Sequence, residues 1–82
     1  MDKLNAISIF CKVIETQSFT KAAALQNISV AMASKLVSQL EEQLKTRLLQ
    51  RTTRKIVPTE AGSLYYQRCQ PILLELEEAE SS

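Results

Sequence analysis

The sequence lacks histidine altogether and contains a single glycine, Gly62. Without histidine the chain lacks the commonest general base and zinc ligand, and it cannot form a Ser-His-Asp arrangement. One glycine cannot build the glycine-rich loop that cradles a phosphate or a dinucleotide. These absences argue against an enzyme, and we predict neither a metal site nor a cofactor.

Long apolar runs are also missing. No stretch approaches the roughly 18 to 20 apolar residues of a membrane span, and no segment resembles a signal peptide. We therefore expect a cytoplasmic protein with no membrane partner. Cys11 and Cys69 lie far apart and form no CxxC motif, so we interpret both as buried apolar side chains. A chain of 82 residues suffices for one small helical core.

Charge is distributed unevenly along the chain, although the net charge is only +1. Residues 21–55 have a net charge of +5, because two acidic residues stand against seven basic ones, which are Lys21, Lys35, Lys45, Arg47, Arg51, Arg54 and Lys55. Residues 56–82 contain five glutamates and one arginine, a net charge of −4. This asymmetry predicts a basic centre that meets a polyanion; a basic face that is merely solvated is the alternative.

The first helix is predicted over residues 2–16 and has two apolar stripes. The first stripe follows i, i+3, i+4, i+7 spacing, and we assign it to the core: Leu4, Ile7, Phe10, Cys11 and Ile14. The second stripe, on another side, consists of Ala6, Ile9 and Val13. A helix that is apolar on two sides in so small a protein usually packs against a second surface. We therefore predict that Ile9 and Val13 contact another subunit.

Two helices in close succession predict a helix-turn-helix. The first is expected over residues 21–26, with Thr20 as its N-cap and Asn27 in the left-handed conformation that ends it. The second, over about 30–44, is expected to follow Ser29 as its N-cap. Its narrow apolar stripe consists of Ala33, Leu36, Val37, Leu40 and Leu44.

The face opposite this stripe carries small, hydroxyl-bearing or basic side chains, which are Ala31, Ser34, Lys35 and Ser38, and it has Glu42 at its far end. A helix that enters the DNA major groove needs such a face, because little bulk lets the backbone approach and a lysine can reach guanine O6 and N7. Val30, at the helix start, suits a thymine methyl group. Packing of this small-residue face on another helix is the alternative.

Residues 48–57 predict a β-hairpin wing. Short strands are expected over 48–51 and 55–57, with β-branched residues and a terminating Pro58. The side chains gathered there suit phosphate oxygens or the minor groove, and they are Arg51, Thr52, Thr53, Arg54 and Lys55. Edge strands also carry lysine and arginine for solubility, which is the alternative reading of this cluster.

The last helix is predicted over about 60–80, with Thr59 as its N-cap. Its apolar residues repeat at heptad spacing, which is typical of a helix that pairs with another: Tyr65, Cys69, Ile72, Leu76 and Ala79. We therefore predict a homodimer through this helix. Pro71 is expected to bend it, and Gly62 is expected at a close backbone approach.

The chain contains, in this order, the strings FCKVIETQSFTKAAALQNIS and SKLVSQLEEQLKTRLLQRTTRKIVPTEAG, followed by the predicted long helix. Together they resemble the amino-terminal DNA-binding domain of LysR-type transcriptional regulators, and the resemblance covers essentially the whole chain. It implies a mostly α fold, with a winged helix-turn-helix (three-helix core plus β-hairpin wing) over residues 1–58 and a linker helix over 59–82. It also implies a dimer, formed through the linker and first helices, that binds inverted repeats in promoter DNA. An effector-binding domain for a small molecule is expected outside this sequence, and a tetramer is possible in the intact protein.

Carried over residue by residue, the resemblance assigns base reading to Val30, Ala31, Ser34, Lys35 and Ser38, and phosphate contacts to Thr20, Lys21, Arg51, Thr52, Thr53 and Arg54. Family members often have Gln and Pro where this chain has Val30 and Ala31, Gly where Asn27 stands, and Phe where Leu49 stands. Loss of that glutamine removes a potential bidentate adenine contact. A protein-interaction or coiled-coil module without specific DNA binding is the alternative function.

Overall fold

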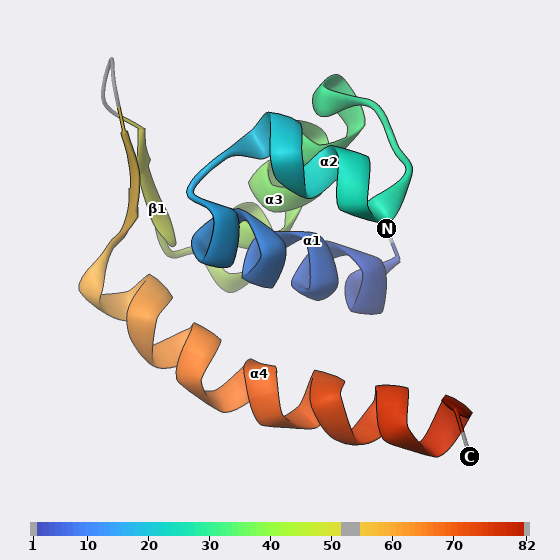
Figure 1. The fold of residues 1–82 in the computed structure, drawn as a ribbon. Coiled ribbons are helices and arrows are strands. Elements are labelled where there is room, and N and C mark those ends of the chain that lie inside the picture. The colour runs from blue at the N-terminus through green and yellow to red at the C-terminus, as the bar shows by residue number, and fades with distance from the viewer. Residues whose placement is uncertain (1, 52–54, 82) are drawn as a thin grey trace.

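The computed structural model describes residues 2–51 and 55–81. In chain order its elements are α1 (Lys3–Thr16), α2 (Phe19–Gln26), α3 (Val30–Leu44), β1 (Leu49–Arg51), β2 (Ile56–Pro58) and α4 (Glu60–Ser81) (Figure 1). This order confirms the predicted winged helix-turn-helix followed by a long helix. Among the described residues, no helix combines the length and the apolar character that crossing a membrane requires.

Side chains that accept backbone hydrogen bonds set where the first three helices begin. The N-caps of α1, α2 and α3 are Asp2, Ser18 and Ser29. The Ser29 cap confirms the prediction, whereas Thr20 was wrongly predicted to cap α2. Ser18 accepts from the Lys21 backbone N–H at 3.1 Å, so α2 begins at Phe19 and Thr20 lies within its first turn.

The same three helices end on a non-glycine residue with positive φ: Gln17 at 57°, Asn27 at 59° and Lys45 at 54°. The left-handed conformation lets the cap backbone N–H reach a carbonyl in the last turn of its helix. Asn27 therefore ends α2 as predicted. Ser29 caps α3 only two residues later, which makes the turn between the two helices short.

Helix α1 lies between two layers, with α2 and α3 on one side and α4 on the other (Figure 1). Ile9 and Val13 are 0% exposed within this single chain. Their predicted role in a subunit interface is therefore wrong, because both side chains are enclosed in the core of the chain itself. Members of the first apolar stripe lie against α4 instead: Leu4 and Ile7 line a hollow with residues of α4, and Phe10 contacts Tyr65. Leu4, near the start of α1, is 48% exposed. Both apolar sides of α1 therefore pack against other helices of the same chain.

The wing is an antiparallel pair in which Leu49 pairs with Pro58, Gln50 with Val57 and Arg51 with Ile56. The second strand therefore includes Pro58, one residue beyond the predicted strand end. This position tolerates proline because it lies at the end of the ladder, where a missing N–H removes little. The predicted contact residues Thr52, Thr53 and Arg54 lie outside the described residues.

The N-cap of α4 is hydrogen-bonded to the backbone just before the wing. The Thr59 hydroxyl accepts from the Gly62 N–H at 2.9 Å and donates to the Arg47 carbonyl at 2.6 Å, so Thr59 caps the helix as predicted. A Cβ at Gly62 would overlap the Leu48 carbonyl oxygen. The predicted close backbone approach is therefore confirmed, and α4 then continues through Pro71 to Ser81 as one helix.

Both cysteines lie in the contact region of α1 and α4, and both are free and buried. Burial raises the pKa of the Cys11 thiol from 9.0 to about 12. Beside them, the rings of Phe10 and Tyr65 lie 5.8 Å apart between centroids, at 49°. Tyr65 and Cys69 were predicted at a dimer interface, yet both pack against α1 of their own chain.

Candidate nucleic-acid interface

One face of α3 is buried and the other is open. Ala33, Val37 and Leu40 are 0% exposed, and they hold the helix against α1 and α2. At about 100° per residue, the opposite face presents Ala31, Lys35 and Ser38, all exposed, with the half-buried Ser34 beside them and the exposed Val30 at the helix start. No helix among the described residues covers this face, which removes the alternative that its small side chains pack on another helix of the chain.

The first turn of α2 provides the second part of the surface. Thr20 and Lys21 are exposed there, directly after the Ser18 cap. Backbone N–H groups and the positive end of the helix dipole lie at a helix N-terminus, and both favour a nearby anion. In this turn Thr20 is better placed for its predicted phosphate contact than for the predicted capping role.

The basic side chains of the central segment are exposed wherever the structure describes them: Lys21, Lys35, Lys45, Arg47, Arg51 and Lys55. On α1, by contrast, Lys12 is half-buried, and its Nζ lies 3.6 Å from Glu15 Oε1. The described basic side chains of residues 21–55 thus lie at the surface, where an external polyanion can reach them. Among the described residues, no group of three or more cysteine or carboxylate side chains is placed to hold a metal ion.

A carboxylate at the end of α3 fixes the start of the wing. Glu41 Oε2 accepts the backbone N–H of Leu48 at 2.8 Å and that of Leu49 at 3.1 Å. In the sequence Glu41 is only an acidic residue in a basic segment, and no local pattern marks this role. The carboxylate reaches seven and eight residues along the chain, so only the fold brings donor and acceptor together.

Arg51, at the end of β1, contacts both helices of the helix-turn-helix. Its Nη1 donates to Ser34 Oγ on α3 at 3.2 Å, and its Cζ lies 4.7 Å from the centroid of the Phe19 ring on α2. The sequence predicted Arg51 for phosphate and Ser34 for bases, but not their mutual contact. Phe19 was missed altogether, because its place just before the predicted α2 gave it no visible role.

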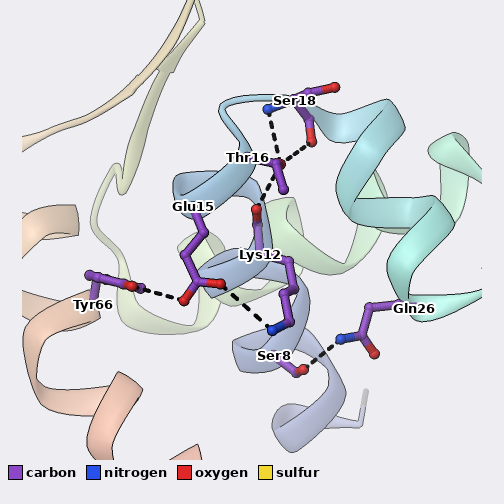
Figure 2. A network of polar contacts seen from close by, with 7 residues as sticks. All are labelled: Ser8, Lys12, Glu15, Thr16, Ser18, Gln26 and Tyr66. Atoms are coloured by element: carbon purple, nitrogen blue, oxygen red, sulfur yellow. Dashed lines mark hydrogen bonds and ion pairs between the residues drawn. The ribbon is translucent and has the colours of Figure 1, made fainter.

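Polar contacts orient α1 against its neighbours on both sides, as Figure 2 shows. The Tyr66 hydroxyl of α4 donates to Glu15 Oε2 at 2.8 Å, and Gln26 Nε2 of α2 donates to Ser8 Oγ at 2.9 Å. Burial, followed by this hydrogen bond to Glu15, raises the pKa of the Tyr66 hydroxyl from 10.0 to about 12. These contacts set the direction of α4 relative to the helix-turn-helix.

Beyond Cys69, α4 leaves much of its apolar surface uncovered within the chain. Ile72 is 60% exposed, and Leu74 is 49% exposed. Leu76 is half-buried and Ala79 is exposed. A small apolar hollow lies at the α1–α4 boundary and is lined by Leu4, Ile7, Cys69, Ile72 and Leu73. The more exposed members of the predicted heptad thus lie in the second half of the helix, whereas Tyr65 and Cys69 in the first half contact α1. Leu64, in the first half but outside the heptad, is 58% exposed.

A family model described as bacterial regulatory helix-turn-helix protein, lysR family, matches residues 4–63. An HTH-type transcriptional regulator of Haemophilus influenzae is 87% identical over 82 residues, which are 100% of this chain and 28% of the relative. The HTH-type transcriptional activator AaeR of Escherichia coli is 46% identical over 78 residues, 95% of this chain and 25% of the relative. The chain therefore spans about a quarter of the length of these curated relatives.

Solved structures are similar as well. The crystal structure of the BenM_DBD/catB site 1 DNA complex superposes with a TM-score of 0.88 at 35% sequence identity. The match covers 95% of this chain and 87% of that chain. The similarity thus extends over the helix-turn-helix, the wing and most of the long helix.

Proposed function

The chain belongs to the lysR family of bacterial regulatory helix-turn-helix proteins, and we propose that it binds promoter DNA as a symmetric dimer, with α3 in the major groove. It is a DNA-binding domain of this family and not an enzyme. The observation that carries the proposal is the exposed, small-residue face of α3, together with the exposed basic side chains at the start of α2 and in the wing.

Base reading is proposed for the exposed face of α3. Lys35 can extend to the acceptors of guanine, and the hydroxyls of Ser34 and Ser38 can donate or accept at base edges. Ala31 and Val30 keep the helix start free of bulk and supply apolar contacts to a thymine methyl. Their small side chains allow the first turn of α3 to approach the base pairs closely.

Phosphate binding is proposed for the exposed side chains around this face. Thr20 and Lys21 lie in the first turn of α2, and Arg51 and Lys55 belong to the wing, whose Arg51 contacts Phe19 at the start of α2. Thr52, Thr53 and Arg54 complete the wing in sequence, and we propose the same role for them. Such contacts fix the register of the protein on the duplex without reading its sequence.

Dimerisation is proposed through the second half of α4, with Ile72, Leu76 and Ala79 at the contact. Exposed apolar side chains in this half and the heptad spacing support the proposal. In the intact protein we propose a cytoplasmic regulator that binds a small-molecule effector outside residues 1–82, and a tetramer is compatible with this arrangement.

Fluorescence anisotropy tests the DNA-binding proposal directly. The 82-residue chain is titrated with duplex from its own upstream promoter and with a scrambled duplex of equal composition, each across a salt series. We expect tighter binding to the promoter and a steep fall in affinity with salt, because phosphate contacts release counterions. Equal affinity for both duplexes would contradict binding at this promoter, and no binding to either would favour a protein-interaction module.

Analytical ultracentrifugation tests the interface on α4. Ile72→Glu is expected to give monomers, because a charge would enter an apolar contact between subunits. Gln67→Glu adds the same charge at another exposed position of α4 and serves as the matched control. A dimer that survives Ile72→Glu would place the interface elsewhere.

A further inference from the structure

We infer that Arg51 is a positioning residue for base reading: its guanidinium fixes the Ser34 hydroxyl so that this hydroxyl donates its proton to an acceptor on a base edge. This inference rests on the proposed function. It assigns Arg51 a role beyond a phosphate contact, and it assigns Ser34 a defined polarity in the groove.

The position of Arg51 follows from its strand. Side chains alternate across a strand, so Arg51 points to the same face as Leu49, which is buried against the helices. Glu41 holds the backbone N–H groups of Leu48 and Leu49, which ties the start of this strand to the last turns of α3. Arg51, two residues further on, then lies over the first half of the same helix, where Ser34 is found.

A second contact places the guanidinium over the Phe19 ring. Its Cζ lies 4.7 Å from the centroid of the Phe19 ring, within the range of a cation–π interaction. A lysine at this position would retain the charge but would lose the planar stack and the fork of N–H donors. The contact to Phe19, together with the hydrogen bond to Ser34, therefore holds the Arg51 N–H donors in a defined position as well as supplying a charge.

The hydrogen bond to Ser34 determines what that hydroxyl can do next. A serine hydroxyl has one proton to donate and two lone pairs to accept with. Arg51 Nη1 donates to Oγ at 3.2 Å, and among the described residues Ser34 donates to no acceptor. A bound cationic donor also polarises the O–H bond and makes it a better donor.

A donor at this point selects among bases. Guanine N7 and O6, adenine N7 and thymine O4 accept in the major groove, whereas the amino groups of cytosine and adenine donate. Ser34 is thus expected to prefer a base pair that turns an acceptor toward it. Arg51 retains further N–H donors for a phosphate oxygen, so one side chain connects contact with the backbone to the reading of a base.

Selection from a randomised duplex library tests the inference. The wild-type chain, Arg51→Lys, Ser34→Ala and the control Lys21→Ala are each used to enrich sequences, and the affinity for the wild-type consensus is then measured across a salt series. Arg51→Lys and Ser34→Ala are expected to lose preference at the same base pair of each half-site, by about tenfold. Arg51→Lys should keep the salt slope, whereas Lys21→Ala should flatten it and leave the base preference unchanged.

Three outcomes overturn the inference. An Arg51→Lys profile identical to wild type would show that any cation suffices, and a uniform loss across all positions would reduce Arg51 to a phosphate contact. Independent, multiplicative losses in the Arg51→Lys, Ser34→Ala double variant would show that the two residues do not act together. A wild-type chain that enriches no sequence would instead contradict the proposed function, and the base-reading inference would fall with it.

Nuclear magnetic resonance tests the arrangement without DNA. The Arg51 side-chain signals should be shifted by the Phe19 ring current, and Phe19→Leu should remove that shift while most other amide signals stay in place. Arg51 signals that are the same in both proteins would overturn the inference even if the DNA-binding proposal held.

Discussion

Helices α1 and α3 are nearly equal in length, 14 and 15 residues, and end in the same way, yet they have opposite surroundings. Each begins at a side-chain cap and ends on a residue in the left-handed conformation. Helix α1 is covered by α2 and α3 on one side and by α4 on the other, whereas α3 is buried on one side only. Similar local signals thus produce a central core helix, α1, and a helix with one exposed face, α3.

The side chains on the second face explain the difference. In α1 that face is apolar, and the chain folds its last helix over it. In α3 it consists of small, polar and basic groups whose burial would release little hydrophobic free energy and would desolvate a charge. The composition of the second face, rather than helix length or capping, therefore determines that α1 is covered on both sides and that α3 keeps one face exposed.

The largest expected effect concerns α1. Phe10→Ala should lower the free energy of unfolding by about 3–5 kcal/mol, because it empties a fully buried site that also contacts Tyr65. Ser38→Ala on the exposed face of α3 should stay within about 0.5 kcal/mol. Urea denaturation measures both, and equal losses would erase the distinction between the two helices.

The next effect concerns α3 and appears in binding rather than in stability. Lys35→Ala should cost about 1–3 kcal/mol of DNA-binding free energy and relax base preference, while its thermal midpoint stays close to wild type. Lys3→Ala removes the same charge from an exposed position on α1 and is the matched control. If anisotropy titrations gave the two variants equal affinity, α3 would have no special share in recognition.

A smaller effect tests how α4 covers α1. Tyr66→Phe should lower the free energy of unfolding by about 1 kcal/mol, because it removes the 2.8 Å hydrogen bond to Glu15. In a Glu15→Gln background the same substitution should cost less, since the charged acceptor is already gone. Additive losses in this double-mutant cycle would mean that the contact does not hold the two helices together.

The smallest effect follows from the enclosed thiol of Cys11. Its pKa is about 12 in the folded chain and 9.0 as the ordinary value, so above pH 9 the unfolded chain binds fewer protons than the folded one. Stability should therefore fall as the pH rises from about 9 toward 12, by less than about 1 kcal/mol at pH 9.5. Denaturation of Cys11→Ala over the same pH range should show a shallower slope, and an unchanged slope would exclude the thiol as its source.

Periodicity and capping chemistry were enough to predict most of the architecture. Asn27, Ser29 and Thr59 were located from local rules, and Gly62 was expected at a close approach before its neighbour Leu48 was known. The errors arose where two local solutions compete. Ser18 and Thr20 can both cap a helix, and the backbone after Gln17 lets Ser18 do so first.

Long-range choices were harder to predict. Periodicity shows that α1 has two apolar stripes but not whether Ile9 faces a partner or the chain's own helices. The contact of Arg51 with Ser34 and the double hydrogen bond of Glu41 also depend on tertiary placement. The exposed face of α3 was predictable because a missing apolar stripe is visible in sequence, whereas a contact between two polar side chains is not.

The backbone of Leu48 connects α3 to the start of α4. Its N–H is bonded to Glu41 of α3, its carbonyl accepts the backbone N–H of Thr59 at 2.9 Å, and its backbone lies against Gly62 of α4. In the proposed dimer, these contacts hold the recognition helix α3 and the linker helix α4 of each subunit in a fixed relative position. The distance between the two recognition helices is then a fixed dimension of the protein. A base pair inserted between half-sites rotates one of them by about a tenth of a turn, and the DNA has to twist to compensate.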